Sequence, residues 1–284
     1  MAEKAHFDVR LMCNVLGVSP SAYYEWEREQ ESQHEKRDAE LLVLVRRIFV
    51  DFRGRYGAPR IHDKLAAQGV SVSRKRVARL MREAGLKAKS RRKYKATTDS
   101  NHSLPIAPNL LKRDFEVDRP NAVWVSDITY IWTRQGWMYL AVILDLYSRK
   151  VVGWSLAERM TASLICDAID AAVRLRRPGE DLVFHSDRGS QYASKVFRRR
   201  LWRYRMRQSM SRKGNCWDNA VAESFFATLK KELIRNHAFE TRAHARSEVF
   251  EYIEVFDNRQ RSHSLLGYET PDGFESCIKN KNVA

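Results

Sequence analysis

Apolar residues recur at helical spacing over the first part of the chain and in short, strand-sized runs over the rest. In residues 8–30 the helical spacing is interrupted at Gly17, a residue that can adopt the left-handed conformation at a helix end. It resumes after Ser19 and Pro20, an N-cap followed by a proline at the first helical position. This segment therefore predicts a helix, a tight turn and a second helix.

A second group of helices is predicted from residue 39 onward. An amphipathic helix, a turn rich in Gly and Pro and a short helix precede a third helix over residues 73–85. The apolar face of this third helix would dock on its own domain, and it consists of Val77, Leu80, Met81 and Ala84. The opposite face carries Lys75, Arg79 and Arg82. That arrangement is typical of a DNA-recognition helix, although an ordinary basic surface helix would show it too.

The remainder of the chain alternates strand-like and helical patterns. Five strands are predicted, over residues 122–133, 137–148, 150–158, 181–187 and 207–211. Helices are predicted over residues 162–175, 194–204, 217–232 and 242–256. The first three strands follow one another closely and are expected to be antiparallel. The order βββαβαβα predicts an α/β fold, with a mixed five-stranded sheet and helices on both of its faces.

These patterns divide the chain into four expected parts. They are an N-terminal helical segment of the helix–turn–helix type (1–38), a basic helical DNA-binding domain (39–98), a linker (99–118) and a core with a C-terminal tail (119–284). The linker is placed where the sequence becomes polar and punctuated by proline, after a basic arm at residues 87–95.

Composition narrows the class of protein. A hydrophobic content of 44% with 11% aromatic residues is enough for a packed core. No apolar run approaches the roughly 18 residues of a membrane span, and the first ten residues lack a signal peptide's apolar segment, so an intracellular protein is expected. The four cysteines are far apart, which argues against a zinc site and a disulfide framework.

Charge points to a polyanionic partner. The chain has a net charge of +16, and residues 41–98 alone hold seventeen Lys or Arg against three Asp or Glu, a net charge of +14. So dense a positive segment favours binding to nucleic acid, with a basic solubilising surface as the alternative.

Two acidic residues stand in strand contexts: Asp127 inside the first predicted strand and Asp187 at the end of the fourth. A carboxylate in an apolar strand is unfavourable unless it is paired, hydrogen-bonded or bound to a cation. If these strands are neighbours, the two carboxylates lie side by side, and a helix over the sheet edge can bring Glu223 to them. Three converging carboxylates suit Mg²⁺ or Mn²⁺. Two such ions, roughly 3.5–4 Å apart, can activate a water or a 3′-hydroxyl in phosphoryl transfer.

Nearby residues compete for these roles. Asp145 also ends a strand, where a structural hydrogen-bonding role is preferred to that of a fourth ligand. His185 lies two residues before Asp187 and is either a neighbour of the site or a satisfied core histidine. The eight histidines show no metal-ligand spacing.

The predicted helix over residues 217–232 carries the third carboxylate. We expect Asp218 to be its N-cap, with the role of third ligand in place of Glu223 as the alternative. Lys230 follows Glu223 by two helical turns and projects from nearly the same face. Taken alone, this Glu–Lys pair is more typical of a solvated surface, and the strand carboxylates are what favour a role in the site.

The acidic residues and the sequence around them resemble a known family. With 35 residues between Asp187 and Glu223, the three carboxylates match the D,D(35)E signature shared by retroviral integrases and many transposases. Longer segments are similar to the second-reading-frame product (OrfB) of the IS-three family of bacterial insertion sequences. They include WVSDITYI, LDLYSRKVVGW, HSDRGSQY, SRKGNCWDNAVAESFFATLKKE and NRQRSHSLLGYETPDGFE. RGRYGAPRIHDKL and LGVSPSAYYEW extend the resemblance over almost the whole chain.

The resemblance implies a DNA transposase with an RNase-H-like core, a polynucleotidyl transferase that performs Mg²⁺-dependent 3′-end cleavage and strand transfer. It implies that Asp127, Asp187 and Glu223 are the catalytic, metal-binding triad, for two Mg²⁺ ions that Mn²⁺ can replace. It also implies that Lys230 contacts DNA near the active site. The zinc-binding domain of retroviral integrases has no counterpart in the sequence.

The expected partners follow from the same resemblance. They are double-stranded DNA (the element's terminal inverted repeats and the target), further copies of the chain in a homo-oligomer, and the first-frame product (OrfA), bound or fused. The expected location is the bacterial cytoplasm, at the nucleoid when DNA is bound. The alternatives are a structure-specific nuclease on the same fold and a non-catalytic DNA-binding regulator.

Overall fold

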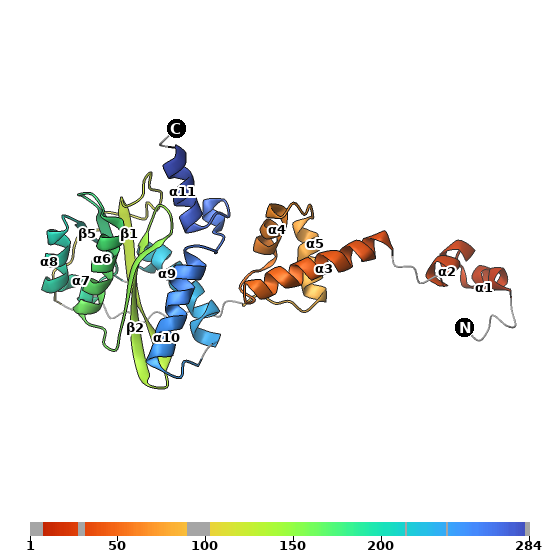
Figure 1. Cartoon of the computed structure of the whole chain (residues 1–284), viewed down its shortest axis with the longest axis horizontal. Coiled ribbons are helices and arrows are strands. Elements are labelled where there is room, and N and C mark those ends of the chain that lie inside the picture. The colour runs from red at the N-terminus through yellow and green to blue at the C-terminus, as the bar shows by residue number, and fades with distance from the viewer. Residues whose placement is uncertain (1–7, 28–31, 90–102, 214, 237, 282–284) are drawn as a thin grey trace. The chain divides into compact units, whose positions relative to one another are not determined.

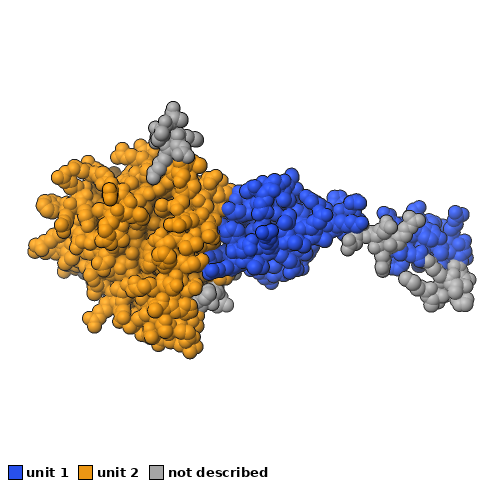
Figure 2. All heavy atoms as spheres, viewed as in Figure 1, with its two compact units in different colours: residues 1–88 blue, residues 89–284 orange. Residues whose placement is uncertain are grey.

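The computed structural model describes residues 8–27, 32–89, 103–213, 215–236 and 238–281. The chain forms two compact units, residues 1–88 and residues 89–284 (Figure 2). The first unit is helical and the second is built on a sheet (Figure 1). Residues 90–102, which hold most of the expected basic arm and the start of the expected linker, lie outside the described residues.

The predicted N-terminal helix pair is confirmed as α1 (Val9–Leu16) and α2 (Pro20–Glu27). Gly17 ends α1 with a φ of 66°, so the chain turns there at no steric cost. The Ser19 hydroxyl accepts a hydrogen bond from the backbone N of Ala22 and so satisfies one free donor of the first turn of α2.

Three more helices complete the first unit: α3 (Gln33–Asp51), α4 (Ala58–Ala67) and α5 (Arg74–Glu83). These helices pack against one another, and the buried residues on them are Leu41, Val45, Ile48, Ile61, Leu65, Val77, Leu80 and Met81, with Tyr56 buried in the turn between α3 and α4. Of the apolar face expected for α5, Val77, Leu80 and Met81 are buried and Ala84 is half-buried. A capping box between Ser32 and Glu35 starts α3 at Gln33, so the boundary expected after residue 38 falls inside a helix.

The second unit contains the predicted mixed five-stranded sheet, in the spatial order β3–β2–β1–β4–β5. The strands are β1 (Val123–Thr133), β2 (Gly136–Asp145), β3 (Val151–Ala157), β4 (Val183–Ser186) and β5 (Arg207–Met210). The first three are antiparallel, as expected, and β4 runs parallel to both β1 and β5.

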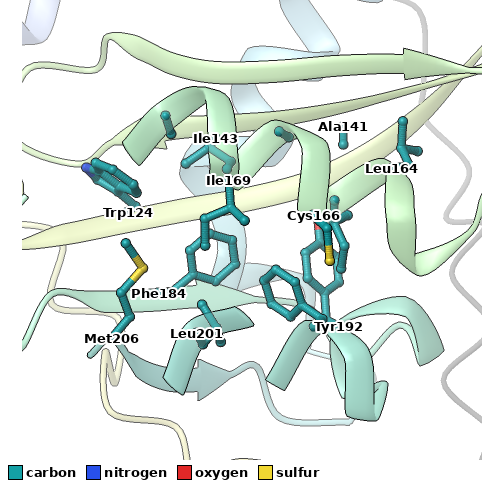
Figure 3. Packing of buried hydrophobic residues seen from close by; sticks show 14 of the residues in the cluster. Trp124, Ala141, Ile143, Leu164, Cys166, Ile169, Phe184, Tyr192, Leu201 and Met206 are labelled. Atoms are coloured by element: carbon teal, nitrogen blue, oxygen red, sulfur yellow. The ribbon is translucent and has the colours of Figure 1, made fainter. Parts of the chain in front are cut away.

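Helices cover both faces of the sheet (Figure 1). On one face lie α6 (Ala162–Arg176), the short α7 (Ser190–Ala193) and α8 (Lys195–Arg203), and on the other lie α9 (Ala220–Glu232) and α10 (Arg242–Phe250). The core under α6 to α8 packs Trp124, Ile143, Ile169 and Phe184 together (Figure 3). Because a Cβ on Gly153 would lie 2.5 Å from the Ala168 carbonyl oxygen, only glycine permits this approach of α6 to β3.

The C-terminal region departs most from the sequence prediction. The helix expected over residues 242–256 is present, but its second half, Glu251–Asp257, is a π-helix. A further helix, α11 (Pro271–Lys281), was not predicted, because its first residues, Pro271-Asp272-Gly273, have the composition of a turn. Proline is compatible with the start of a helix, where its missing N–H is not needed. Short 3₁₀ helices lie at Cys216–Asn219, Ile234–Asn236 and Ser264–Leu266.

Candidate active site

The two strand carboxylates lie next to each other because of the strand register. In the parallel ladder between β1 and β4, Ser126 pairs with Ser186, so the residues that follow occupy neighbouring positions, Asp127 on β1 and Asp187 directly after the end of β4. The Asp127 carboxylate accepts a hydrogen bond from the backbone N of Ile128, and Asp187 accepts one from the backbone N of Gly189. The condition on which the sequence argument depended, that the first and fourth strands are neighbours, is met.

Glu223 approaches the two aspartates from the first turn of α9. The start of this helix is tied to β1, because Asn219 donates a side-chain hydrogen bond to the backbone carbonyl of Ser126, the residue before Asp127. On the other side, the Ser126 hydroxyl donates to the Val142 carbonyl and is 2.8 Å from the Tyr192 hydroxyl. Since the single Ser126 proton is engaged, Tyr192 is the donor of that bond. Ser126 thus joins α7 and α9 to the strand that carries Asp127.

The carboxylates influence one another electrostatically. Burial, and then the neighbouring charge of Asp187, raise the pKa of Asp127 well above its usual range. Burial and Asp187 also raise the pKa of Glu223. The buried Tyr192 hydroxyl has a pKa raised by burial and then by the charges of Asp127 and Asp187. Three acidic groups therefore share one half-buried region in which negative charge accumulates.

This region fits a hard divalent cation in the chemistry of its ligands. All three candidate ligands are carboxylates, the oxygen donors that Mg²⁺ and Mn²⁺ prefer. Bound positive charge would relieve the repulsion that raises the pKa values of Asp127 and Glu223. Within the described residues, however, no three His, Cys, Asp or Glu side chains are close enough together to hold one ion as they stand. The side chains would have to draw inward to ligate it.

Lys230 lies beside the carboxylates, on the last turns of α9. Its ammonium group is 5.3 Å from the centre of the Tyr130 ring. Burial lowers the pKa of Lys230, while the charge of Asp127 opposes that shift. The Glu–Lys pair of the sequence is thus a half-buried feature of the site rather than a solvated surface pair.

Asp218 does not have the role predicted for it. The residue at the N-cap position of α9 is Asn219, and Asp218 lies in the preceding 3₁₀ helix. Its fully buried carboxylate accepts hydrogen bonds from Asn109, Arg113 and Arg212. The side-chain hydrogen bond from Arg212 is the largest of the causes that hold the pKa of Asp218 well below its usual range. The N-cap prediction was wrong because partners distant in sequence bind this carboxylate.

Asp145 and His185 have structural partners. Asp145 is buried and accepts hydrogen bonds from the backbone N atoms of Asn121 and Tyr147 and from Arg176, which agrees with the preferred structural role. The His185 ring lies between the Ser209 and Ser211 hydroxyls, at 2.8 and 3.2 Å. Burial lowers the pKa of His185 to about 4. Of the two alternatives for His185, the satisfied core histidine is the one observed.

The far end of α9 is held by a buried ionic network. Glu232, at the C-terminal end of the helix, pairs with Arg261 and accepts a hydrogen bond from the Tyr252 hydroxyl at 2.9 Å. Arg261 also pairs with Asp257 in the π-helix. Because a buried charge without its partner is strongly unfavourable, this network fixes the helix end that follows Lys230.

The basic face of α5 is only partly available. Lys75 and Arg82 are exposed. Arg79 instead pairs with Asp38 on α3 and with Glu83 one turn further on. Arg76, outside the predicted face, also pairs with Asp38. Of the three residues of this helix predicted to contact DNA, Lys75 and Arg82 thus face solvent. The third, Arg79, links α5 to α3.

Sequence reasoning missed the residues that position the carboxylates, namely Ser126, Tyr192, Arg212 and Asn219. Their roles depend on contacts between segments that are 6 to 93 residues apart along the chain. One signal was available, since Asn219 directly follows Asp218 at the expected helix start and asparagine is a common N-cap residue.

No described helix is long and apolar enough for a transmembrane span.

Comparison with known proteins places both parts of the chain among known families. A family model described as "Integrase core domain" matches residues 117–216, a second model of that description matches residues 204–271, and an "HTH-like domain" matches residues 36–94. A 31 kDa protein of insertion element IS600 from Shigella sonnei is 46% identical over 93% of this chain and 97% of its own length. The transposase InsF of insertion sequence IS3A from Escherichia coli is 44% identical over 99% of this chain and 97% of its own length.

Among solved structures, the catalytic core of HTLV-2 integrase in complex with magnesium is similar with a TM-score of 0.41 and 18% identity, over 54% of this chain and 94% of that one. A simian T-cell lymphotropic virus intasome gives a TM-score of 0.43 and 16% identity, over 73% of this chain and 70% of that one.

The sheet topology, the paired aspartates and the matching core models define an integrase-type enzyme with an RNase-H-like core, preceded by a helix–turn–helix-like domain. Such enzymes are polynucleotidyl transferases. More narrowly, the chain belongs to the IS3 family of insertion-sequence transposases, as the sequence resemblance implied.

Proposed function

We propose that the protein cleaves the 3′ ends of an insertion sequence and joins them to target DNA, with Asp127, Asp187 and Glu223 as the catalytic triad. The observation that carries the proposal is the register of β1 and β4, which makes Asp127 and Asp187 neighbours. The raised pKa values of Asp127 and Glu223, both partly due to Asp187, support the inclusion of all three.

Asp127, Asp187 and Glu223 would hold divalent cations, two Mg²⁺ ions or Mn²⁺ in their place. When bound, the cations would supply Lewis acidity at the scissile phosphate and stabilise the leaving oxygen. Bound cations would neutralise the repulsion that raises the pKa values of Asp127 and Glu223. Asn219 and Tyr192 hold α9 and α7 against Ser126, so these hydrogen bonds support the backbone from which Asp127 and Glu223 project.

Lys230 would bind the DNA backbone next to the carboxylates. Its ammonium group lies over the Tyr130 ring and interacts electrostatically with the Asp127 carboxylate. A phosphate that entered between Lys230 and the metal-holding carboxylates would be attracted from both sides. In the first unit, Lys75 and Arg82 on α5 would contact the element's ends, and Arg79 would do so only after release from Asp38.

The reaction joins DNA segments, so we propose double-stranded DNA of the terminal inverted repeats and of the target as substrates. Two ends react in one event, which calls for a homo-oligomer, and a first-frame product (OrfA) is a further expected partner. We place the protein in the bacterial cytoplasm, at the nucleoid when bound to DNA. The helical region through residue 98 would recognise DNA, and the region from residue 119 would catalyse the cleavage and joining of DNA.

The decisive experiment is strand transfer by the Glu223→Gln variant on cognate end DNA in Mg²⁺. Glutamine keeps the size of the side chain and removes its charge, so we expect joined product to fall by at least about 100-fold while DNA binding persists. Full strand transfer by this variant would show that the triad is assigned wrongly. Free ends without joined product from the wild-type protein would indicate the nuclease alternative.

A further inference from the structure

Three aromatic side chains stand exposed on the hairpin formed by β1 and β2. Tyr130, Trp132 and Trp137 are 40%, 54% and 46% exposed, although each is large and apolar enough to favour burial. Trp132 and Trp137 are directly paired across the strands, and Tyr130 lies diagonally opposite Trp137. Alternation along the strands therefore puts all three on one face. We call this cluster the aromatic platform.

The rings contact one another edge to face. The ring centres of Trp132 and Trp137 are 4.8 Å apart, and those of Tyr130 and Trp137 are 5.2 Å apart. This geometry holds the side chains in place while part of each ring remains accessible. A fixed group of exposed aromatic rings is more typical of a binding surface than of a random surface feature.

The platform begins close to the proposed catalytic carboxylates. Tyr130 is three residues beyond Asp127 on the same strand, a rise of about 10 Å, and by alternation its side chain leaves the strand on the opposite face from that of Asp127. Lys230 connects the two places, since its ammonium group lies 5.3 Å from the Tyr130 ring centre and interacts with the charge of Asp127. Adjacent phosphates of a DNA strand are separated by about 3.4 Å along a duplex axis, so the platform is a few nucleotides from the site.

We propose that the aromatic platform stacks unpaired bases of the DNA strand whose phosphate lies at Asp127, Asp187 and Glu223. Aromatic rings bind bases through their faces, which a duplex hides and an unpaired strand offers. The cation at Lys230 complements the backbone of that strand. The aromatic platform would therefore favour DNA that is frayed or single-stranded next to the reacting phosphate. This inference rests on the proposed function for the position of the reacting phosphate.

The test compares two DNA probes with the full-length protein in EDTA, where no cleavage interferes. One probe is a duplex that ends in unpaired thymidines, and the other is the same duplex with a blunt end. We expect Trp132→Ala combined with Trp137→Ala to weaken binding of the unpaired probe by roughly 5- to 100-fold, the range that alanine substitution at a stacked base gives. Binding of the blunt duplex should change by less than about twofold.

Matched variants separate stacking from other effects. Trp202→Ala removes a tryptophan that is 82% exposed on α8, and it should leave both affinities unchanged. Trp132→Phe with Trp137→Phe keeps the aromatic faces and should retain most of the preference for the unpaired probe. Should the double alanine variant fold poorly by its melting temperature, Trp132→Ala alone provides the same comparison.

Several outcomes would overturn the proposal. Equal losses on both probes would make the cluster a general DNA contact, and no loss on either would remove it from DNA binding. A changed oligomeric state by light scattering, with both affinities intact, would make it a contact between copies of this chain. The binding test is independent of the triad assignment, because it is carried out in EDTA and compares the affinities of two probes, neither of which requires strand transfer.

Discussion

Arg212 donates three hydrogen bonds to the carboxylate of Asp218, from its backbone N, Nε and Nη2, each 2.9 Å long. Arg113 adds a fourth from the segment that enters the core before β1. Asp218 immediately precedes Asn219, which ties α9 to the strand of Asp127. The ion pair therefore fixes the start of the helix that carries Glu223.

The Asp218→Asn variant should be less stable and less active. Loss of the charge leaves two arginines with a weaker acceptor, so the free energy of unfolding should fall by about 1–3 kcal/mol. Chemical denaturation at neutral pH measures it, with Asp114→Asn on an exposed carboxylate as the control. An equal effect of the two substitutions would contradict the special role of Asp218.

The same pair predicts a pH dependence. The folded state depresses the pKa of Asp218 below its ordinary value of about 4. Its contribution to stability is then fully present above about pH 4 and is lost as the pH falls through the folded value. The difference in stability between the wild type and Asp218→Asn should stay constant from pH 7 to pH 5 and shrink only below about pH 4.

The acidic site should be destabilising when no metal is bound. Raised carboxylate pKa values mean that the folded state binds protons more tightly, so stability falls as the pH rises from about 4 through the raised pKa of Asp127. In EDTA at neutral pH, Asp187→Asn should therefore melt about 2–4 °C higher than the wild type, the shift that 1 kcal/mol gives in a domain of this size. Mg²⁺ should raise the melting temperature of the wild type and have little effect on the variant. A variant that melts lower in EDTA would contradict the repulsion between the carboxylates.

His185 should remain neutral far below the usual pH for histidine. Its pKa falls to about 4 because burial disfavours the charged ring. The folded state then binds fewer protons than the unfolded state between about pH 6.5 and pH 4, so stability declines as the pH falls through that window. The ring titration, followed by NMR, should have its midpoint near pH 4, whereas a midpoint above pH 6 would mean that the ring is solvated.

Substitutions on the basic face of α5 should have different effects, depending on whether the residue forms an ion pair within the protein. Lys75→Ala and Arg82→Ala should each weaken DNA binding and lower the salt dependence of the affinity by about 0.9 in the log–log slope, if each touches one phosphate. Arg79→Ala should in addition lower the melting temperature, because the pair with Asp38 is lost. DNA binding at several salt concentrations measures the slopes. An unchanged slope in all three variants would place the DNA on another face.

The close approach of α6 and the sheet should make Gly153→Ala destabilising. The added methyl would lie 2.5 Å from the Ala168 carbonyl oxygen and 2.7 Å from the Ala172 Cβ, so the helix must move outward. Overpacking of this kind costs about 1–3 kcal/mol. Gly179→Ala is the control, since nothing lies within 4 Å of its added methyl. Similar melting temperatures for both variants would show that α6 can move outward without loss of stability.

The sequence by itself determined the five strands and most of the helices. Short apolar runs predicted the strands, and Gly17, Ser19 and Ser73 marked helix ends through local bonds that the structure contains. It also predicted that Asp127 needs a partner, because a strand interior penalises an isolated carboxylate. These inferences succeed because they depend on residues a few positions apart.

The tertiary structure decided which polar groups meet. Aspartate is a common N-cap residue, yet the carboxylate of Asp218 binds arginines that are 6 and 105 residues away. The residues next to Asp218 in the sequence do not show that these arginines compete with the helix N-terminus for its carboxylate. Arg79 looks free on the surface of its helix, but α3 supplies Asp38. The neighbouring positions of Asp127 and Asp187 likewise depend on which strands pair and in which register. Periodicity predicts that a strand forms, whereas its partner is chosen by the packing of the whole sheet and its helices.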